Sequence, residues 1–351
     1  TDASTIAGLE SGRIGVAEVA PGSQVDSAVA VAAQHNTAIS SSTTETSVLW
    51  QLLFNLNDSL AGQLGLRQAL TFATDRPEIV ADSVAFGDPA TLAARSRIFA
   101  DGQQGSFAEA PPVVTYDPTR AASLFATSGY VAGPDGLLRF GGVGRPLSLT
   151  IVGPSGNPTI LAAELQLQAE WAAAGVTLAI TNEPMAELLG TTLPQGRYQI
   201  AIAPYLIQAF PTASATVYTD PVLGAPQGGT GPTDSLASRP KWPWSVSTPP
   251  GTEPGAAAAG LVTRDVVGEQ SAQIGSRYEE VLAELNTDQA AAILAKLDTF
   301  LWHELATVPL FQQPVAIVQQ ADLVNVSDSP TWDGVFWDAE NWAIQLNPRG
   351  G

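Results

Sequence analysis

Residues 147–202 hold the pattern that most constrains the fold of this chain. Apolar residues alternate with small or polar ones over 147–151 and over 176–180, as they do in half-buried strands. Residues 158–174 between them are predicted to form a helix, and a third strand is expected over 198–202. Strand, helix and strand at this spacing predict parallel strands joined by a right-handed crossover. The predicted fold class is therefore α/β.

Three helical segments carry apolar residues at three- and four-residue steps, which places those residues on one face of each helix. The buried face of segment 158–174 is predicted to hold Leu161, Leu165, Ala169 and Ala172. Two later helices are predicted to bury, respectively, Ile274, Tyr278, Val281, Leu282 and Leu285, and Leu294, Leu297 and Leu301. A buried leucine stabilises a fold by about 1.5–3 kcal/mol, so we interpret these faces as core. Two short strands, 307–312 and 315–319, are expected to follow.

A strand and two helices are expected before residue 88. Residues 49–57 favour a mostly buried strand. The next helix begins near Leu64 and is predicted to bury Leu66, Ala69, Leu70 and Ala73. Asp75 is expected to cap the helix after it, and Asp117 to cap another, because each is followed within two residues by a proline suited to a first helical turn.

Composition and charge narrow the class of partner. A chain of 351 residues suggests two or more domains, at ~100–200 residues per domain. No run approaches ~18 consecutive apolar residues, and the first ten residues lack the pattern of a signal peptide. The net charge of −19 argues against nucleic acid as a partner, because phosphates would be repelled. The absence of cysteine excludes disulfides and thiolate metal sites.

No catalytic motif is found. The two histidines, His35 and His303, lack the spacing of a zinc-binding helix, and no phosphate-binding glycine loop is present. The run 153–156 lacks the spacing of a nucleophile elbow. We therefore expect no enzyme activity, no catalytic residue, no metal and no cofactor.

Four short motifs occur along the chain in a fixed order. They are Phe54-Asn55 with Arg67-Gln-Ala-Leu70 and Ala73-x-Asp75-Arg76; Tyr116-Asp117-Pro118; Val308-Pro309-Leu310-Phe311; and the closing run Trp337 to Trp342. Together they resemble the family 5 extracellular solute-binding proteins, the peptide- and nickel-binding components of ABC importers. The resemblance implies a two-lobed, periplasmic-binding-protein-like (type II) fold. It also implies non-covalent binding in the cleft between the lobes, with an ABC permease as partner.

The resemblance also implies how the chain divides. Residues 1–46 would form part of lobe I, residues 47–308 lobe II with a long Pro/Gly-rich loop at 204–260, and residues 309–351 a return to lobe I. Family members have a long segment before the point where this chain begins, so the N-terminal part of the first lobe is expected to be missing. Residues 1–46 and the tail after about residue 320 should then pack together and leave apolar surface uncovered. An extracytoplasmic location in the cell envelope is expected, with a lipid anchor on the missing segment.

One run, Tyr205 to Pro211, corresponds to the part of the family that contacts ligand. Peptide-binding members place a tryptophan and an aspartate here, and the aspartate pairs with the free amine of the peptide. This chain has Tyr205, Gln208 and Phe210 in that run, with no acid. An ammonium group buried there would lack a counter-charge, which disfavours ordinary peptides. Trp242 and Trp244, set between prolines, are the other predicted ligand contacts.

Several functions remain open at this point. The first is an importer subunit that binds an uncharged or glycan-containing small molecule. The alternative is a transport-uncoupled actinobacterial envelope lipoprotein. It would regulate synthesis of cell-wall glycolipid or lipoglycan (lipoarabinomannan-type), through a glycan or an envelope glycolipid-synthesis protein. A glycosidase is a third possibility with little support: the tail from Trp332 to Trp342 mixes indoles with acids, and glycoside hydrolysis requires a pair of acids. For that tail, core packing is favoured.

Overall fold

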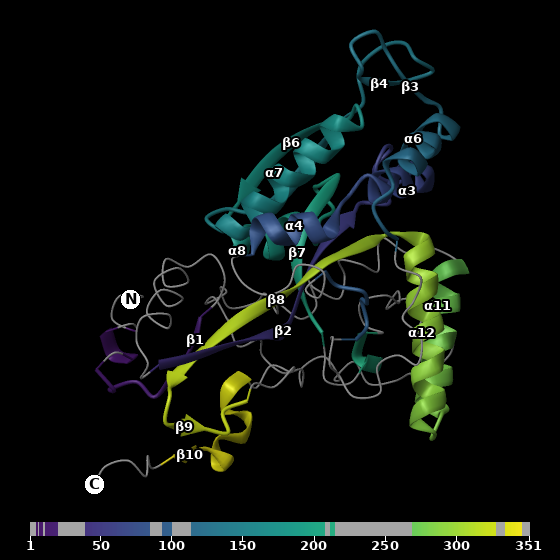
Figure 1. The fold of residues 1–351 in the computed structure, drawn as a ribbon. Coiled ribbons are helices and arrows are strands. Elements are labelled where there is room, and N and C mark those ends of the chain that lie inside the picture. The colour runs from purple at the N-terminus through teal and green to yellow at the C-terminus, as the bar shows by residue number, and fades with distance from the viewer. Residues whose placement is uncertain are drawn as a thin grey trace.

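A six-stranded sheet forms the centre of the described structure, with its strands in the order β1-β8-β2-β7-β5-β6 (Figure 1). The computed structural model describes residues 5, 7–9, 11–19, 39–84, 93–99, 114–207, 211–214, 269–327 and 334–345. The strands are β1 (Val16–Val19), β2 (Ile39–Phe54), β5 (Ser148–Pro154), β6 (Thr177–Glu183), β7 (Ile200–Leu206) and β8 (Thr307–Gln320). Within these residues, no helix is both long enough and apolar enough to cross a membrane.

The long strands β2 and β8 pair antiparallel and run diagonally through the molecule, from the β1 edge to the part that holds β5 and β6 (Figure 1). β2 begins at Ile39, well before the expected residue 49. β8 is continuous, whereas two separate strands were predicted. The register shifts between β2 and β8 fall opposite Pro309 and Pro314. Prolines have no amide hydrogen for the ladder, so local irregularities accommodate them without ending the strand.

The predicted parallel strands and their crossover helix are confirmed. β5 pairs in parallel with both β6 and β7, and α7 (Pro158–Ala173) connects β5 to β6. Leu149 and Ile151 of β5 belong to the same core cluster as the buried side chains of α7. Val152, the next residue, belongs to a second cluster on the other face of the sheet. Helices therefore cover both faces of this part of the sheet.

α7 buries a different face from the predicted one. All four residues of the predicted face are exposed, with Leu161 and Leu165 at 44% and 50%. The buried residues are Thr159, Ile160, Ala163, Glu164, Leu167 and Trp171. The apolar residues of α7 lie on both its exposed and its buried face, so periodicity alone could not select the face that is buried. The face that contacts the sheet holds Trp171, whose indole N–H donates to Thr74 Oγ1 at 3.0 Å.

The helices α3 (Leu64–Phe72), α4 (Arg76–Ser83) and α6 (Pro118–Thr127) pack in the same core cluster as α7. The predicted caps are confirmed: Asp75 accepts a hydrogen bond from the Glu78 amide and Asp117 one from the Arg120 amide. The predicted residues Leu66, Ala69, Leu70 and Ala73 are all buried. After α6, β3 (Tyr130–Ala132) and β4 (Leu138–Phe140) form a small hairpin.

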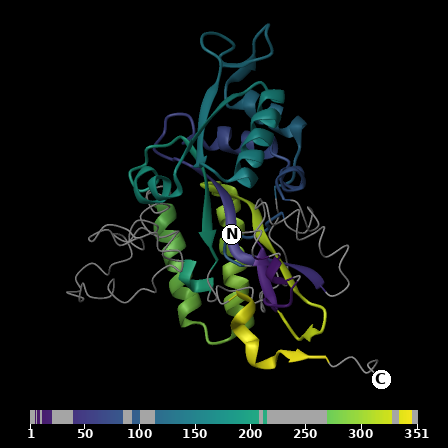
Figure 2. The same cartoon turned by 90° about the vertical axis from the view of Figure 1, so that its left-hand side faces the viewer.

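The opposite face of the sheet is covered by α11 (Glu269–Ala283) and α12 (Thr287–Glu304), which lie side by side (Figure 2). The short elements α8 (Met185–Glu187), η1 (Leu188–Thr192) and η2 (Pro211–Ser214) join them there. Most predicted core residues of α11 and α12 are buried, but Leu282 and Leu285 are 70% and 96% exposed. Those two leucines were predicted to be core, and that prediction is wrong: Leu282 is in the last turn of α11 and Leu285 is in the connection to α12, where the chain leaves the core.

The first and last described segments contact each other, as expected. β1 pairs antiparallel with β8, and the Val335 amide donates to the Glu18 carboxylate at 2.7 Å. The tail continues through β9 (Leu323–Val324), η4 (Gly334–Asn341) and β10 (Ala343–Ile344), where Phe336 and Ile344 are each 66% exposed. The expected lobe boundaries, 46/47 and 308/309, fall within β2 and β8, so both strands would pass from one proposed lobe to the other.

Candidate functional site

The two connections within the group β5, β6 and β7 pass over opposite faces of the sheet. α7 joins β5 to β6 on one face, and α8 with η1 joins β6 to β7 on the other. Adjacent parallel strands whose connections diverge in this way form a topological switch point, and ligands of open α/β sheets bind outside the carboxyl ends of such strands. The neighbouring pair here is β5 and β7. Their carboxyl ends are therefore the candidate site.

Tyr205 stands at the carboxyl end of β7, one residue before the strand ends. It lies opposite Leu49 in the ladder and is half-buried. Its ring packs on the small apolar cluster of Leu49, Ala94 and Ile207. Tyr205 is thus a predicted site residue that the structure places at the switch point.

Amide side chains share the sheet face of Tyr205. Gln51 lies two positions along β2 from Leu49, so it is a diagonal neighbour of Tyr205 on the same face. Gln51 is buried, and its Oε1 has no hydrogen-bond partner among the described residues. Gln312, paired with Leu49 from β8, donates to the Thr46 carbonyl at 2.7 Å. These groups can donate and accept hydrogen bonds without carrying charge.

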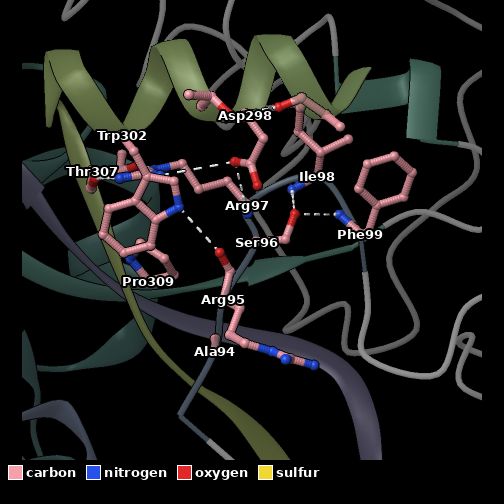
Figure 3. A network of polar contacts seen from close by, with 12 residues as sticks. Ala94, Arg95, Ser96, Arg97, Ile98, Phe99, Asp298, Trp302, Thr307 and Pro309 are labelled. Carbon is pink, nitrogen blue, oxygen red and sulfur yellow. Dashed lines mark hydrogen bonds and ion pairs between the residues drawn. The ribbon is translucent and has the colours of Figure 1, made fainter. Parts of the chain in front are cut away.

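The segment 93–99, which supplies Ala94, is fixed by a buried network around Arg97 (Figure 3). The Arg97 Nε donates to Thr307 Oγ1 at 3.0 Å, and the guanidinium lies 4.1 Å from the centre of the Trp302 ring. The Trp302 indole N–H donates to the Arg95 carbonyl at 3.1 Å. This network holds segment 93–99 against α12 and β8. It therefore fixes Ala94, one of the residues on which the Tyr205 ring packs.

Arg97 and Asp298 form an ion pair that is fully buried, with 3.8 Å between Nη1 and Oδ1. Burial raises the pKa of Asp298 above its ordinary value, and the positive charge of Arg97 opposes that shift. Arg76 lies 5.0 Å from the Trp302 ring centre. Burial, together with the nearby charge of Arg97, lowers the pKa of Arg76 to about 10.

A second buried side chain with a carboxyl group is Glu164 on α7, which lies beside Gly153 near the end of β5. Its Oε2 accepts a hydrogen bond from Asn182 Nδ2 at 2.7 Å, and Asn182 Oδ1 accepts one from the Gly153 amide at 3.2 Å. Oε1 has no partner among the described residues. Burial raises the pKa of Glu164 to about 7, so this group changes charge close to neutral pH.

Sequence reasoning missed Arg97, Asp298 and Glu164, although two of them left a signal. Asp298 falls at helical steps from Leu294 and Leu301, inside the face predicted to be core. Glu164 likewise shares the buried face of α7. A charged residue within an apolar helical face indicates a buried polar contact. Arg97 lies outside the helices and strands of the described structure and carried no such pattern.

Four of the five predicted ligand contacts, Gln208, Phe210, Trp242 and Trp244, lie outside the described residues. Their role stays a prediction. Most of the predicted loop 204–260 also lies outside, and β7 continues to Leu206 beyond its expected start. Within the described ranges, no three His, Cys, Asp or Glu side chains come together as metal ligands would.

A sequence profile of the bacterial extracellular solute-binding proteins, family 5, middle region, matches residues 1–220. Two solved proteins share the fold. NikA from Brucella suis, in complex with Fe(III)-EDTA, has a TM-score of 0.71 and 16% identity, and the match covers 98% of this chain and 60% of NikA. The oligopeptide-binding protein AppA from Bacillus subtilis, in complex with a nonapeptide, has a TM-score of 0.68 and 13% identity, covering 98% and 59%.

Curated relatives share a shorter stretch. Uncharacterized lipoproteins of Mycobacterium tuberculosis and Mycobacterium bovis are 29% identical to this chain over 77 residues. That stretch is 22% of this chain and 14% of each lipoprotein. The matches thus cover about 60% of the solved proteins named above and 14% of the lipoproteins, less than two thirds of the length in each case.

Proposed function

This chain belongs to the family 5 bacterial extracellular solute-binding proteins, and from that premise we propose that it binds a small solute non-covalently at the carboxyl ends of β5 and β7. The observation that carries the proposal is Tyr205, whose half-buried ring lies at this switch point. Buried Gln51 beside it supplies an amide oxygen that needs a donor. Binding, without a chemical step, is the activity.

The ligand that we propose is uncharged at this site and bears hydroxyl or amide groups, as a glycan does. The run from Ala201 to Thr219 contains no acid, so the run that follows Tyr205 lacks the carboxylate that pairs with the amine of a peptide. Burying an unpaired ammonium group is costly. The aromatic residues Tyr205, Phe210, Trp242 and Trp244 would supply flat surfaces for stacking.

The proposed setting is the cell envelope, with lipid anchorage and delivery of the solute to an ABC permease. The lipoprotein names of the mycobacterial relatives and the extracellular character of the family support this setting. Residues 1–46 and 309–351 would belong to one lobe and residues 47–308 to the other. The pairing of β1 with β8 supports the first of these groupings.

Calorimetry tests the proposal with two ligand sets, unmodified peptides and neutral envelope oligosaccharides. We expect saturable binding of an oligosaccharide and no peptide bound more tightly than about 1 µM. Tyr205→Ala should weaken oligosaccharide binding about tenfold, the loss of one aromatic contact. The matched control is Tyr116→Ala, because Tyr116 is 46% exposed and precedes α6, away from the switch point.

Micromolar or tighter binding of unmodified peptides would overturn the proposed ligand class. Binding confined to lipoarabinomannan-type glycans, or to a glycolipid-synthesis protein, would favour the envelope-regulator alternative over an importer subunit.

A further inference from the structure

A polar pocket of about 380 Å³ lies beside the edge strand β6, away from Tyr205. Its lining includes Thr150, Thr181, Glu183, Glu187, Thr192 and Arg197. The pocket also touches Ile200, at the start of β7. Five steps along the strand separate Ile200 from Tyr205, which is roughly 16 Å at ~3.3 Å per residue. The pocket is therefore separate from Tyr205, although Glu183 pairs with Pro154 at the carboxyl end of β5.

Glu183 brings a carboxylate to this pocket from the end of β6. Its backbone carbonyl accepts a hydrogen bond from the Ser155 amide at 2.7 Å, which fixes the end of the strand. Its side-chain Oε1 is buried and has no hydrogen-bond partner among the described residues. Glu183 lines the pocket as a residue, and an ammonium group is the strongest donor that a small ligand can offer a carboxylate.

Arg197 brings the opposite charge. Its guanidinium lies 3.7 Å from Glu187, and the two side chains are 55% and 52% exposed. That distance exceeds a normal hydrogen bond, and exposed ion pairs of this kind contribute little to stability. Arg197 can therefore exchange Glu187 for the carboxylate of a ligand at little cost, with two parallel hydrogen bonds.

We propose that this pocket binds a small zwitterion, with its ammonium group on Glu183 and its carboxylate on Arg197. Thr150, Thr181 and Thr192 also line this pocket. A volume of about 380 Å³ is at the lower end of the range for ligand pockets, which suits a molecule the size of a free amino acid. This site and its charged ligand go beyond the proposed function, which concerns a neutral ligand at Tyr205.

Calorimetry with free amino acids tests the proposal on the unaltered protein. We expect at least one amino acid to bind with a Kd of about 1 mM or tighter. Its N-acetyl form and its carboxamide form should each bind about tenfold more weakly, because each lacks one of the two charges. The absence of binding up to about 10 mM, or equal binding of the blocked forms, would overturn the proposal.

Variants then locate the binding. Glu183→Gln and Arg197→Gln should each weaken it about tenfold, whereas Glu187→Gln should preserve or strengthen it by freeing Arg197. Glu280→Gln is the matched control, because Glu280 forms a half-exposed ion pair with Arg277 on α11, outside the pocket. Unchanged affinity in Glu183→Gln would refute the assignment. Tyr205→Ala should leave amino acid binding intact, so failure at either site is distinguishable from failure at the other.

Discussion

The carboxyl group of Glu164 occupies the space into which a side chain at Gly153 would extend. A Cβ atom at Gly153 would overlap Glu164 Oε1 and lie 2.7 Å from Ile202 Cγ2. Glycine here lets α7 approach β5 closely, so that a carboxyl group fits between helix and sheet. Gly153 is the next-to-last residue of β5, so this contact lies at the end of the strand that borders the candidate site.

Gly153→Ala should destabilise the protein. The added methyl group has no room, and overpacking of this kind costs about 1–3 kcal/mol of unfolding free energy. Urea unfolding followed by circular dichroism measures the loss. Gly190→Ala is the control, because a Cβ at Gly190 would meet no atom within 4 Å. Equal stability of the two variants would show that Glu164 and Gly153 do not pack as described.

The stability of the protein should fall as pH rises from about 4.5 to about 7 through the contribution of Glu164. Burial raises the folded-state pKa of Glu164 to about 7, above the ordinary value of 4.5. The folded state therefore holds a proton that the unfolded state has released, so the stabilisation is complete below pH 4.5 and is lost by pH 7. Glu170, whose pKa burial likewise raises to about 7, adds an effect of the same sign.

Glu164→Gln isolates the contribution of Glu164. Relative to the unaltered protein, this variant should gain about 2–3 kcal/mol of unfolding free energy between pH 5 and pH 8, because glutamine carries no charge at either pH. Urea unfolding at both pH values gives the difference. Glu280→Gln, at a half-exposed position, should show no such gain. A difference that is the same at pH 5 and pH 8 would contradict the assignment.

The buried ion pair gives a third prediction. Arg97→Met leaves Asp298 buried without its counter-charge, which should cost about 3–5 kcal/mol of unfolding free energy. Adding Asp298→Leu should restore part of that loss, since the unpaired charge is then removed. Arg277→Met breaks an exposed pair instead and should change stability by about 0.5 kcal/mol or less. If the double variant is less stable than Arg97→Met alone, the unpaired charge of Asp298 is not the source of the lost unfolding free energy.

The sequence predicts strands and capped helices of this fold well because local chemistry determines them. Alternating apolar residues around Leu149 and the caps at Asp75 and Asp117 required no tertiary information, and all three predictions are confirmed. The buried face of α7 was predicted wrongly because the helix carries leucines and alanines on both its exposed and its buried face. Only the position of the sheet decides between Leu161 and its buried neighbour Ile160.

The candidate site was less accessible to sequence reasoning. Tyr205 was predicted from a family resemblance, and the structure places it at the switch point. The pairing of Arg97 with Asp298 joins positions 201 residues apart, which no local pattern reveals. The strand β8 was predicted as two strands, 307–312 and 315–319, with Pro314 between them. The irregular pairing with β2 that accommodates the prolines of β8 is a property of two strands together.

The last prediction concerns the two tryptophans of the loop that the sequence predicts over 204–260. If Trp242 and Trp244 stack on the ligand, replacing either with alanine should weaken binding of the neutral oligosaccharide about tenfold. The melting temperature should stay unchanged, because tryptophans in a loop of the predicted kind would contribute little to the core. Trp171→Ala is the contrasting control: Trp171 is fully buried, so its loss should cost about 3–5 kcal/mol of unfolding free energy. Thermal unfolding and calorimetry on the same samples separate the two effects. A loop variant that unfolds early while binding normally would assign these tryptophans to the core.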